Sequence, residues 1–164
     1  MNRRGLTLVE MLMTIAVLGM VASMVLPLLG DGAAGRIGVA SILLRDDLEQ
    51  ARFRTVANPE RPLAVVVAED GAGWMVVDPA MPDTPTTRDD GTPWIIRAGE
   101  DRAAGMEDVI IALQGTSEPL LDFDESGAVR DRSATPSFRI SCGERVRIIE
   151  VGAVTGLVRI HNEE

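Results

Sequence analysis

The sequence contains no lysine, one cysteine and one histidine, and each scarcity narrows the range of functions. All 16 positive side chains are arginine, and 25 acidic residues outnumber them, so the net charge is -9. An acidic chain does not favour general nucleic-acid binding, which needs a basic patch. Cys142 alone cannot form an internal disulfide, so the fold must depend on an apolar core. His161 alone gives no zinc-type His/Cys spacing and no basis for a Ser-His-Asp arrangement.

The acidic residues give no clear catalytic or metal site either. Asp122, Asp124 and Glu125 carry the hard oxygen ligands that calcium prefers, but their spacing is not that of an EF-hand. The same residues fit the cap of a turn more simply. We therefore expect no enzyme activity, no bound metal and no cofactor.

Charge is also missing from a long N-terminal stretch. Residues 6–29 contain one charge, Glu10, and residues 11–29 contain none. As a helix, those last 19 residues span about 28 Å, close to the hydrocarbon thickness of a bilayer. Arg3 and Arg4 precede the stretch, and the positive-inside rule predicts that they stay cytoplasmic while the rest of the chain is exported.

Two ordinary explanations of this stretch do not account for Glu10. A secretory signal peptide has a shorter apolar region and would be removed by its cleavage. A plain signal anchor has no need of a carboxylate, which costs about 3 kcal/mol or more within an apolar helix. A carboxylate within an apolar helix therefore indicates a functional role for Glu10 and requires a group that interacts with its charge.

The residues around Glu10 identify that partner. The segment Gly5-Leu6-Thr7-Leu8-Val9-Glu10-Met11-Leu12 resembles the leader of type IV prepilins and type II secretion pseudopilins. The resemblance implies that a prepilin peptidase removes residues 1–5 by cutting between Gly5 and Leu6 and then methylates the new N-terminus at Leu6. The family usually has phenylalanine where this chain has Leu6, and both are apolar.

The resemblance also gives Glu10 a role in assembly. Cleavage leaves a positively charged amino group on Leu6 near neutral pH. In the family, the glutamate of one subunit is thought to neutralise the N-terminus of its neighbour in the filament core. A low-dielectric core strengthens this attraction and penalises an unpaired charge, so the pair would set the subunit register.

A break in the helix is expected after this segment. Pro27 lies within the apolar run, and three glycines follow before residue 36. Proline removes an intrahelical hydrogen bond, and glycine weakens a helix interior. A kink, with the partial melting seen in pilin relatives, and a helix end followed by a linker remain equally open.

Residues 30–59 are predicted to continue as an amphipathic helix that packs on a globular head. Residues at three- and four-residue steps form one stripe, and the charges between them are interpreted as a solvated face. Asn58 and Pro59 end the helix. The stripe consists of Ile37, Ala40, Ser41, Leu44, Leu48, Ala51 and Thr55, and the charged or polar face of Arg45, Asp46, Asp47, Glu49, Gln50, Arg52 and Arg54.

Residues 60–164 are predicted to form a β-rich head, in which short β-branched or alternating runs replace the helical period. The whole chain is therefore an α+β subunit with a long N-terminal helix, transmembrane in its first half, and an antiparallel β-sheet head. Residues 79–93 and 98–105 read as loops. The expected strands are 63–68, 73–78, 94–97, 109–113, 120–124, 128–130, 137–142, 145–149 and 156–161.

Three elements of the head are similar to the GspH/FimT family of minor pseudopilins and minor pilins. They are Gly73-Trp74, the 123–127 segment Phe-Asp-Glu-Ser-Gly, and the 155–160 segment Thr-Gly-Leu-Val-Arg-Ile. Basic residues near the C-terminus contribute to DNA binding in the FimT branch. Arg159 fits that pattern, but Leu157 stands where a basic residue is frequent, and acidic neighbours would repel phosphate. Nucleic acid is thus disfavoured as a partner.

The remaining singular residues are interpreted as parts of the core. Cys142 lies in an alternating strand and is expected to be a small buried hydrophobe. Trp74 and Trp94 are expected to anchor the core or a loop.

Three functions follow from these observations. The first is a minor pseudopilin of a type II secretion system, whose periplasmic filament helps to export folded proteins. The second is a minor pilin of a type IV pilus, for pilus assembly or DNA uptake, where a basic surface would be expected. The third is a membrane-anchored periplasmic enzyme or binding module, for which a ligand-sized pocket would be expected.

The first function predicts both location and partners. The chain would cross the bacterial inner membrane once, with a cytoplasmic N-terminus and a periplasmic head, and then enter a periplasmic pseudopilus. Its partners would be other pseudopilins or pilins, the prepilin peptidase, the inner-membrane assembly platform and, before assembly, the lipid bilayer. Residues 6–29 would form the filament core after assembly.

Overall fold

The computed structural model describes residues 8–25 and 32–162, and for residues 22–25 and 162 the backbone alone. The chain divides into two compact units, residues 1–32 and 33–164, and each is described by itself. The predicted cleavage site at Gly5 and Leu6 and the predicted break at Pro27 lie outside the described residues.

The first unit contains one helix, α1, which spans Leu8–Val25. Its sequence is apolar on every side of the helix, so no single stripe is set apart for packing. Each side chain described here, from Leu8 to Val21, is exposed. Among the described residues, no helix combines the length and the apolar character needed to cross a membrane.

The helix α2 spans Gly32–Ala57, belongs to the second unit from residue 33 onward, and confirms the predicted amphipathic stripe. All seven predicted stripe residues are buried, because they face the head at helical spacing. The helix ends as predicted, with the Asn58 N–H bonded to the Arg54 carbonyl at 2.9 Å and Pro59 next in the chain. The Thr55 hydroxyl then accepts the Leu63 N–H at 2.9 Å and connects the helix end to the first strand.

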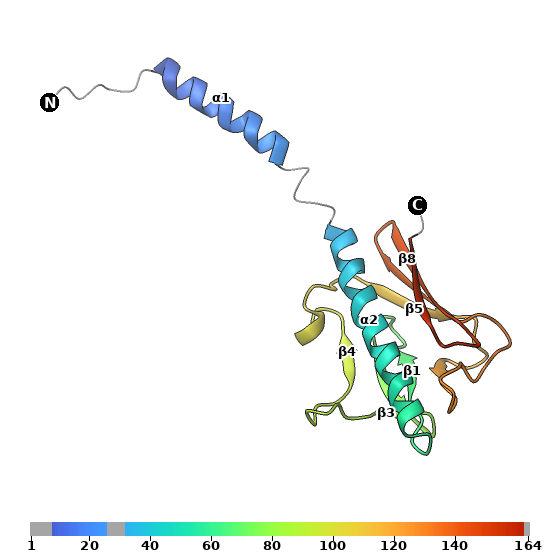
Figure 1. The fold of residues 1–164 in the computed structure, drawn as a ribbon. Helices are drawn as coiled ribbons and strands as arrows, with labels where there is room; N and C mark the ends of the chain where they lie inside the picture. The colour runs from blue at the N-terminus through green and yellow to red at the C-terminus, as the bar shows by residue number, and fades with distance from the viewer. Residues whose placement is uncertain (1–7, 26–31, 163–164) are drawn as a thin grey trace. The chain divides into compact units, whose positions relative to one another are not determined.

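The strands form two antiparallel sheets, which confirms the predicted α+β class (Figure 1). One sheet has the order β3-β2-β1-β6, with β4 also paired to β2, and the other has the order β5-β7-β8-β9. The strands are β1 Ala64–Val67, β2 Gly73–Asp78, β3 Met81–Pro85, β4 Ile95–Arg97, β5 Ile110–Gln114, β6 Leu120–Asp122, β7 Ser137–Cys142, β8 Arg145–Val151 and β9 Val158–Asn162.

Three local predictions need correction. The segment 79–93 was expected to be loop throughout, but it contains β3, which pairs with the end of β2. The segment 98–105 contains a short 3-10 helix, η2, at Asp101–Ala103. The predicted strand at 128–130 makes only an isolated bridge, between Phe123 and Val129. The segments 79–93 and 98–105 are rich in turn-forming or charged residues, and the segment 128–130 has only three residues, so their sequences carry little periodic signal.

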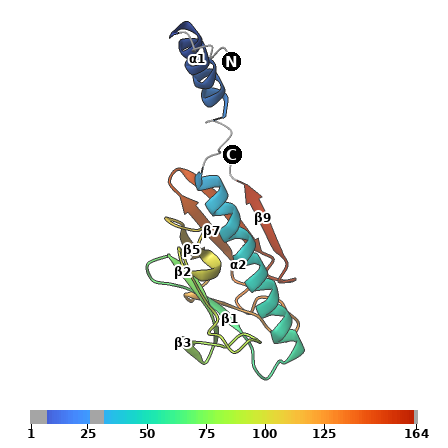
Figure 2. The ribbon, with the colours of Figure 1, turned by 90° about the vertical axis from the view of Figure 1, so that its left-hand side faces the viewer.

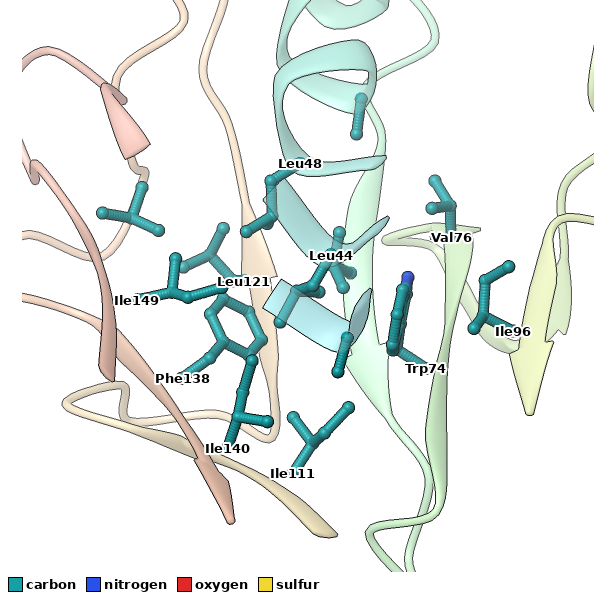
Figure 3. Packing of buried hydrophobic residues seen from close by; sticks show 14 of the residues in the cluster. Leu44, Leu48, Trp74, Val76, Ile96, Ile111, Leu121, Phe138, Ile140 and Ile149 are labelled. Carbon is teal, nitrogen blue, oxygen red and sulfur yellow. The ribbon is translucent and has the colours of Figure 1, made fainter. Parts of the chain in front are cut away.

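The core lies where α2 crosses both sheets (Figure 2). Figure 3 shows Leu44 and Leu48 of α2 pointing between the two sheets, with Phe138 on one side and Trp74 on the other. Each of these four side chains is almost completely buried. One helix therefore supplies the apolar surface that holds the two sheets together.

Candidate functional site

The predicted assembly residue Glu10 lies in the first turn of α1, and its side chain is exposed. A carboxylate near a helix N-terminus interacts favourably with the helix dipole. Gly5 and Leu6, the other members of the predicted processing site, precede the described residues. The roles of all three residues stay predictions.

Exposed apolar side chains surround Glu10 on α1. Each large apolar side chain described there, from Leu8 to Val21, is between 53% and 77% exposed. Soluble surfaces seldom carry a continuous apolar area of this extent unless another molecule covers it. The described part of α1 therefore exposes apolar side chains along its whole length.

Asp47 is a buried carboxylate that the sequence interpretation missed. It was placed on the solvated face of α2, but it is only 1% exposed. Its side chain accepts the Trp74 Nε1–H at 2.9 Å and hydrogen bonds from Arg88 Nη2 at 3.1 and 3.3 Å. A signal for this was present, because position 47 follows Leu44 by three residues and precedes Ala51 by four, on the buried stripe.

Arginines from two elements surround the second tryptophan. The guanidinium carbons of Arg54 and Arg88 lie 4.7 and 4.8 Å from the centre of the Trp94 ring. Arg54 also pairs with Asp89 at 2.6 Å. Cation–π contacts and ion pairs thus fasten the segment before β4 to α2, so both tryptophans anchor the core and its adjoining loop, as predicted.

Two of the family-like motifs meet at Arg52 of α2. Its Nε donates to the Gly127 carbonyl at 2.9 Å. Gly156 has a φ of +63°, and a Cβ added there would lie 1.9 Å from the Gly127 carbonyl oxygen. Glycine is thus required for close packing of the 123–127 and 155–160 segments. This contact gives both motifs a structural role in the head.

Asp124 caps the turn at residues 125–127, as its sequence suggested. Its carboxylate accepts the Ser126 hydroxyl at 2.6 Å and the Ser126 and Ala128 N–H groups at 2.9 and 3.1 Å. These bonds, led by that of the Ser126 hydroxyl, lower the pKa of Asp124 to about 2, and Arg132 contributes in the same direction. The group is therefore held as a carboxylate that stabilises the turn.

The calcium hypothesis for the same region has no ligand cluster to support it. Asp122 pairs with Arg130, and Asp124 pairs with Arg132. Within residues 8–25 and 32–162, no group of three or more His, Cys, Asp or Glu side chains is arranged to hold a metal ion.

The C-terminal strand places the only histidine on the outer face of its sheet. His161 Nε2 lies 3.2 Å from the Glu150 carboxylate on β8. Arg159 lies opposite Glu150 in the strand register and is exposed. Cys142 is a buried free cysteine, as predicted.

A hollow of about 780 Å³ on the head is lined mainly by charged residues near β4 and η2. Its three arginines already pair with carboxylates: Arg88 with Asp47, Arg97 with Asp70 and Arg102 with Asp46. Because each of these arginines is already in an ion pair, their charges do not indicate which ligand the hollow would bind.

The comparison with protein families concerns the N-terminus. Residues 1–26 match the model of the prokaryotic N-terminal methylation motif. The match supports a type IV pilin-like or pseudopilin protein, with processing by a prepilin peptidase and assembly with other pilins. Neither a curated protein nor a solved structure gives a match to the chain.

Proposed function

We propose that the chain is a minor pseudopilin of the GspH/FimT type in a bacterial type II secretion system. The match of residues 1–26 to the prokaryotic methylation motif is the observation that carries the proposal. The exposed apolar surface of α1 supports it, since a filament core or a bilayer would cover that surface. The sequence of residues 6–29 supports a single inner-membrane span before assembly, with the head in the periplasm.

The proposed assembly step begins with processing. Cleavage between Gly5 and Leu6 produces a new amino group, which becomes methylated and carries a positive charge near neutral pH. Glu10 of one subunit neutralises that charge on its neighbour within the apolar core. An unpaired charge there would be heavily penalised, so the pair selects one register between neighbouring helices.

The head is proposed to work through protein contacts and not through catalysis. The two carboxylates that could suggest a site form hydrogen bonds within the head. Asp47 binds Trp74 and Arg88, and Asp124 binds Ser126 and Arg132. Its acidic charge is compatible with protein partners and unfavourable for phosphate.

A minor pilin of a type IV pilus is the second candidate. One observation favours it: Arg159 lies exposed on the last strand, where basic residues serve DNA binding in the FimT branch. Glu150 stands opposite it, which reduces the local positive charge.

Deletion of the gene separates the two candidates. Loss of specific secreted proteins, with DNA uptake and surface pili unchanged, is the result expected for the secretion role. Loss of uptake or pili, with secretion intact, would assign the chain to a type IV pilus. Complementation with the intact gene is the control in both cases.

Two substitutions test the processing and assembly steps separately. Glu10→Ala should leave cleavage largely intact but reduce incorporation into filaments, because the neighbour's amino group loses its partner. Gly5→Val should instead block cleavage, since it changes the residue before the cut. Immunoblots of processed and filament-associated protein distinguish these results, and normal incorporation of Glu10→Ala would rule out the charge-pair mechanism.

A further inference from the structure

Most of the sheet edges in the described head are protected against a further strand. The exposed strand β3 contains Pro82 and Pro85, which lack the N–H groups that pairing requires. The edge strand β4 is only three residues long. These features are common protection against edge-to-edge association.

Two other edges are met by neighbouring segments. The Ile111 N–H of β5 donates to the Gly71 carbonyl of the β1–β2 turn at 2.8 Å. The Asp122 carbonyl of β6 accepts the Arg130 N–H at 3.1 Å. In contrast, β9 ends its sheet, has five residues and contains no proline.

Hydrogen bonds on β8 show which backbone groups of β9 point away from β8. The Val151 N–H points to the β7 side and donates to the Pro136 carbonyl at 2.9 Å, whereas the next N–H, of Gly152, donates to the Leu157 carbonyl at 2.9 Å. Successive peptide groups of a strand point to opposite edges. The backbone groups of residues 159 and 161 therefore face β8, and those of 158, 160 and 162 form the outer edge.

A hollow runs between this edge and α2. Ile160 of β9 and Ile42 of α2 line a space of about 230 Å³, together with Arg45, Asp46 and Glu49. Figure 2 shows α2 and β9 side by side at this margin of the head. A strand added to β9 would place every second side chain over Ile42 and Ile160, where an apolar group is favoured.

The opposite face of β9 presents the guanidinium of Arg159, with Glu150 opposite it on β8. Arg159 is exposed there and has no ion pair among the described residues. His161 lies on the same face, opposite Ile148 in the strand register, and its Nε2 lies 3.2 Å from Glu150, the residue opposite Arg159. In an added strand, the residue beside Arg159 would gain from a negative charge, because opposite charges stabilise cross-strand pairs.

We propose that the outer edge of β9 binds an extended segment of another polypeptide by strand addition. This segment alternates apolar residues, which cover Ile42 and Ile160, with acidic residues, which pair with Arg159. The backbone edge supplies the hydrogen bonds, and the two faces supply the selectivity. The site concerns the head alone and does not rest on whether the chain joins a secretion or a pilus filament.

Amide hydrogen exchange in the full-length chain, held in detergent micelles, tests this site. The probe is the capped peptide Glu-Val-Glu-Val-Glu-Val-Glu, and its control has lysine in place of glutamate. With the acidic peptide, exchange at the amides of Val158, Ile160 and Asn162 should slow at least about tenfold. Arg159 and His161, whose amides already face β8, should change little. Protection elsewhere, no protection at millimolar peptide, or equal binding of the lysine peptide would overturn the proposal.

Backbone and side-chain variants test the mechanism of binding. Two further peptides are N-methylated on alternate residues, one on the odd-numbered and the other on the even-numbered positions. One of the two should no longer bind. Equal binding of both would exclude strand addition. Ile160→Pro should weaken peptide binding at least about tenfold relative to Ile160→Ala, because it removes an outward N–H and no bond to β8. Arg159→Glu should reverse the preference toward the lysine peptide, and an unchanged preference would contradict the assigned charge pairing.

Discussion

The two helices of this chain use apolar residues in opposite ways. In α1, each large apolar side chain described is more than half exposed, whereas Leu44 and Leu48 of α2 are completely buried. The stripe on α2 is covered by the two sheets of its own head, whereas the described side chains of α1 have no such cover within their own unit. Equal substitutions in the two helices should therefore affect different properties: folding of the head for α2, and anchoring or assembly for α1.

Removal of the same side chain from each helix should give the largest contrast. Leu44→Ala should lower the free energy of unfolding of the head by about 3 kcal/mol, because it leaves a cavity between the sheets. Leu18→Ala, at an exposed site on α1, should leave that free energy unchanged. Urea unfolding in detergent, followed by tryptophan fluorescence, measures both values. A similar loss for both variants would show that α1 is part of the folded head.

Glycine substitutions should give the next largest contrast. Gly156→Ala should destabilise the head by about 2–3 kcal/mol, since the new Cβ collides with the Gly127 carbonyl at a left-handed position. Gly143 is also left-handed but has open space around it, so Gly143→Ala should cost only about 1 kcal/mol. Gly19→Ala on α1 also meets open space and should not weaken the head. Equal effects at positions 156 and 143 would assign the whole cost to backbone strain and none to the contact.

Substitutions of three carboxylates sharpen the comparison in a third way. Asp47→Asn should lower head stability by about 2 kcal/mol, because Arg88 loses the charge that it binds in a buried position. The exposed Asp46 is the matched control, and Asp46→Asn should change stability by less than about 0.5 kcal/mol. Glu10→Ala should show the reverse pattern, with normal head stability and reduced incorporation into filaments. Thermal unfolding and filament immunoblots on the same variants would reveal any overlap between the two roles.

Strong periodicity explains why much of the head was predictable. The stripe on α2 and the hairpin of β1 and β2 both depend on regular apolar spacing, and both were found where expected. β3 was missed because its five residues include two prolines and one acid and bury little surface. Asp47 was misplaced because its charge was given more weight than its position on the stripe.

Contacts between distant segments were beyond the reach of the sequence. The approach of Gly156 to Gly127 brings together two motifs that were noted only as family-like, and Arg52 joins them from α2. The sequence of neither motif indicates which distant segment it contacts, since such contacts arise only when both sheets pack on the helix. The N-terminal segment was easier to interpret, because processing and assembly are encoded in consecutive residues.

Asp124 should give the smallest effect, through the pH dependence of head stability. Its pKa is lowered from 3.8 to about 2 in the folded chain, so the folded state favours the carboxylate. The resulting stability, about 1 kcal/mol after screening by solvent, is present above pH 3.8 and is lost as the pH falls through about 2. Asp124→Asn should therefore flatten the decline between pH 4 and pH 2 without abolishing it, because the pKa of Asp131 is lowered too. Urea midpoints across this range measure the slope. Leu18→Ala should keep the wild-type slope. A different slope in this variant would show that α1 takes part in the acid unfolding of the head.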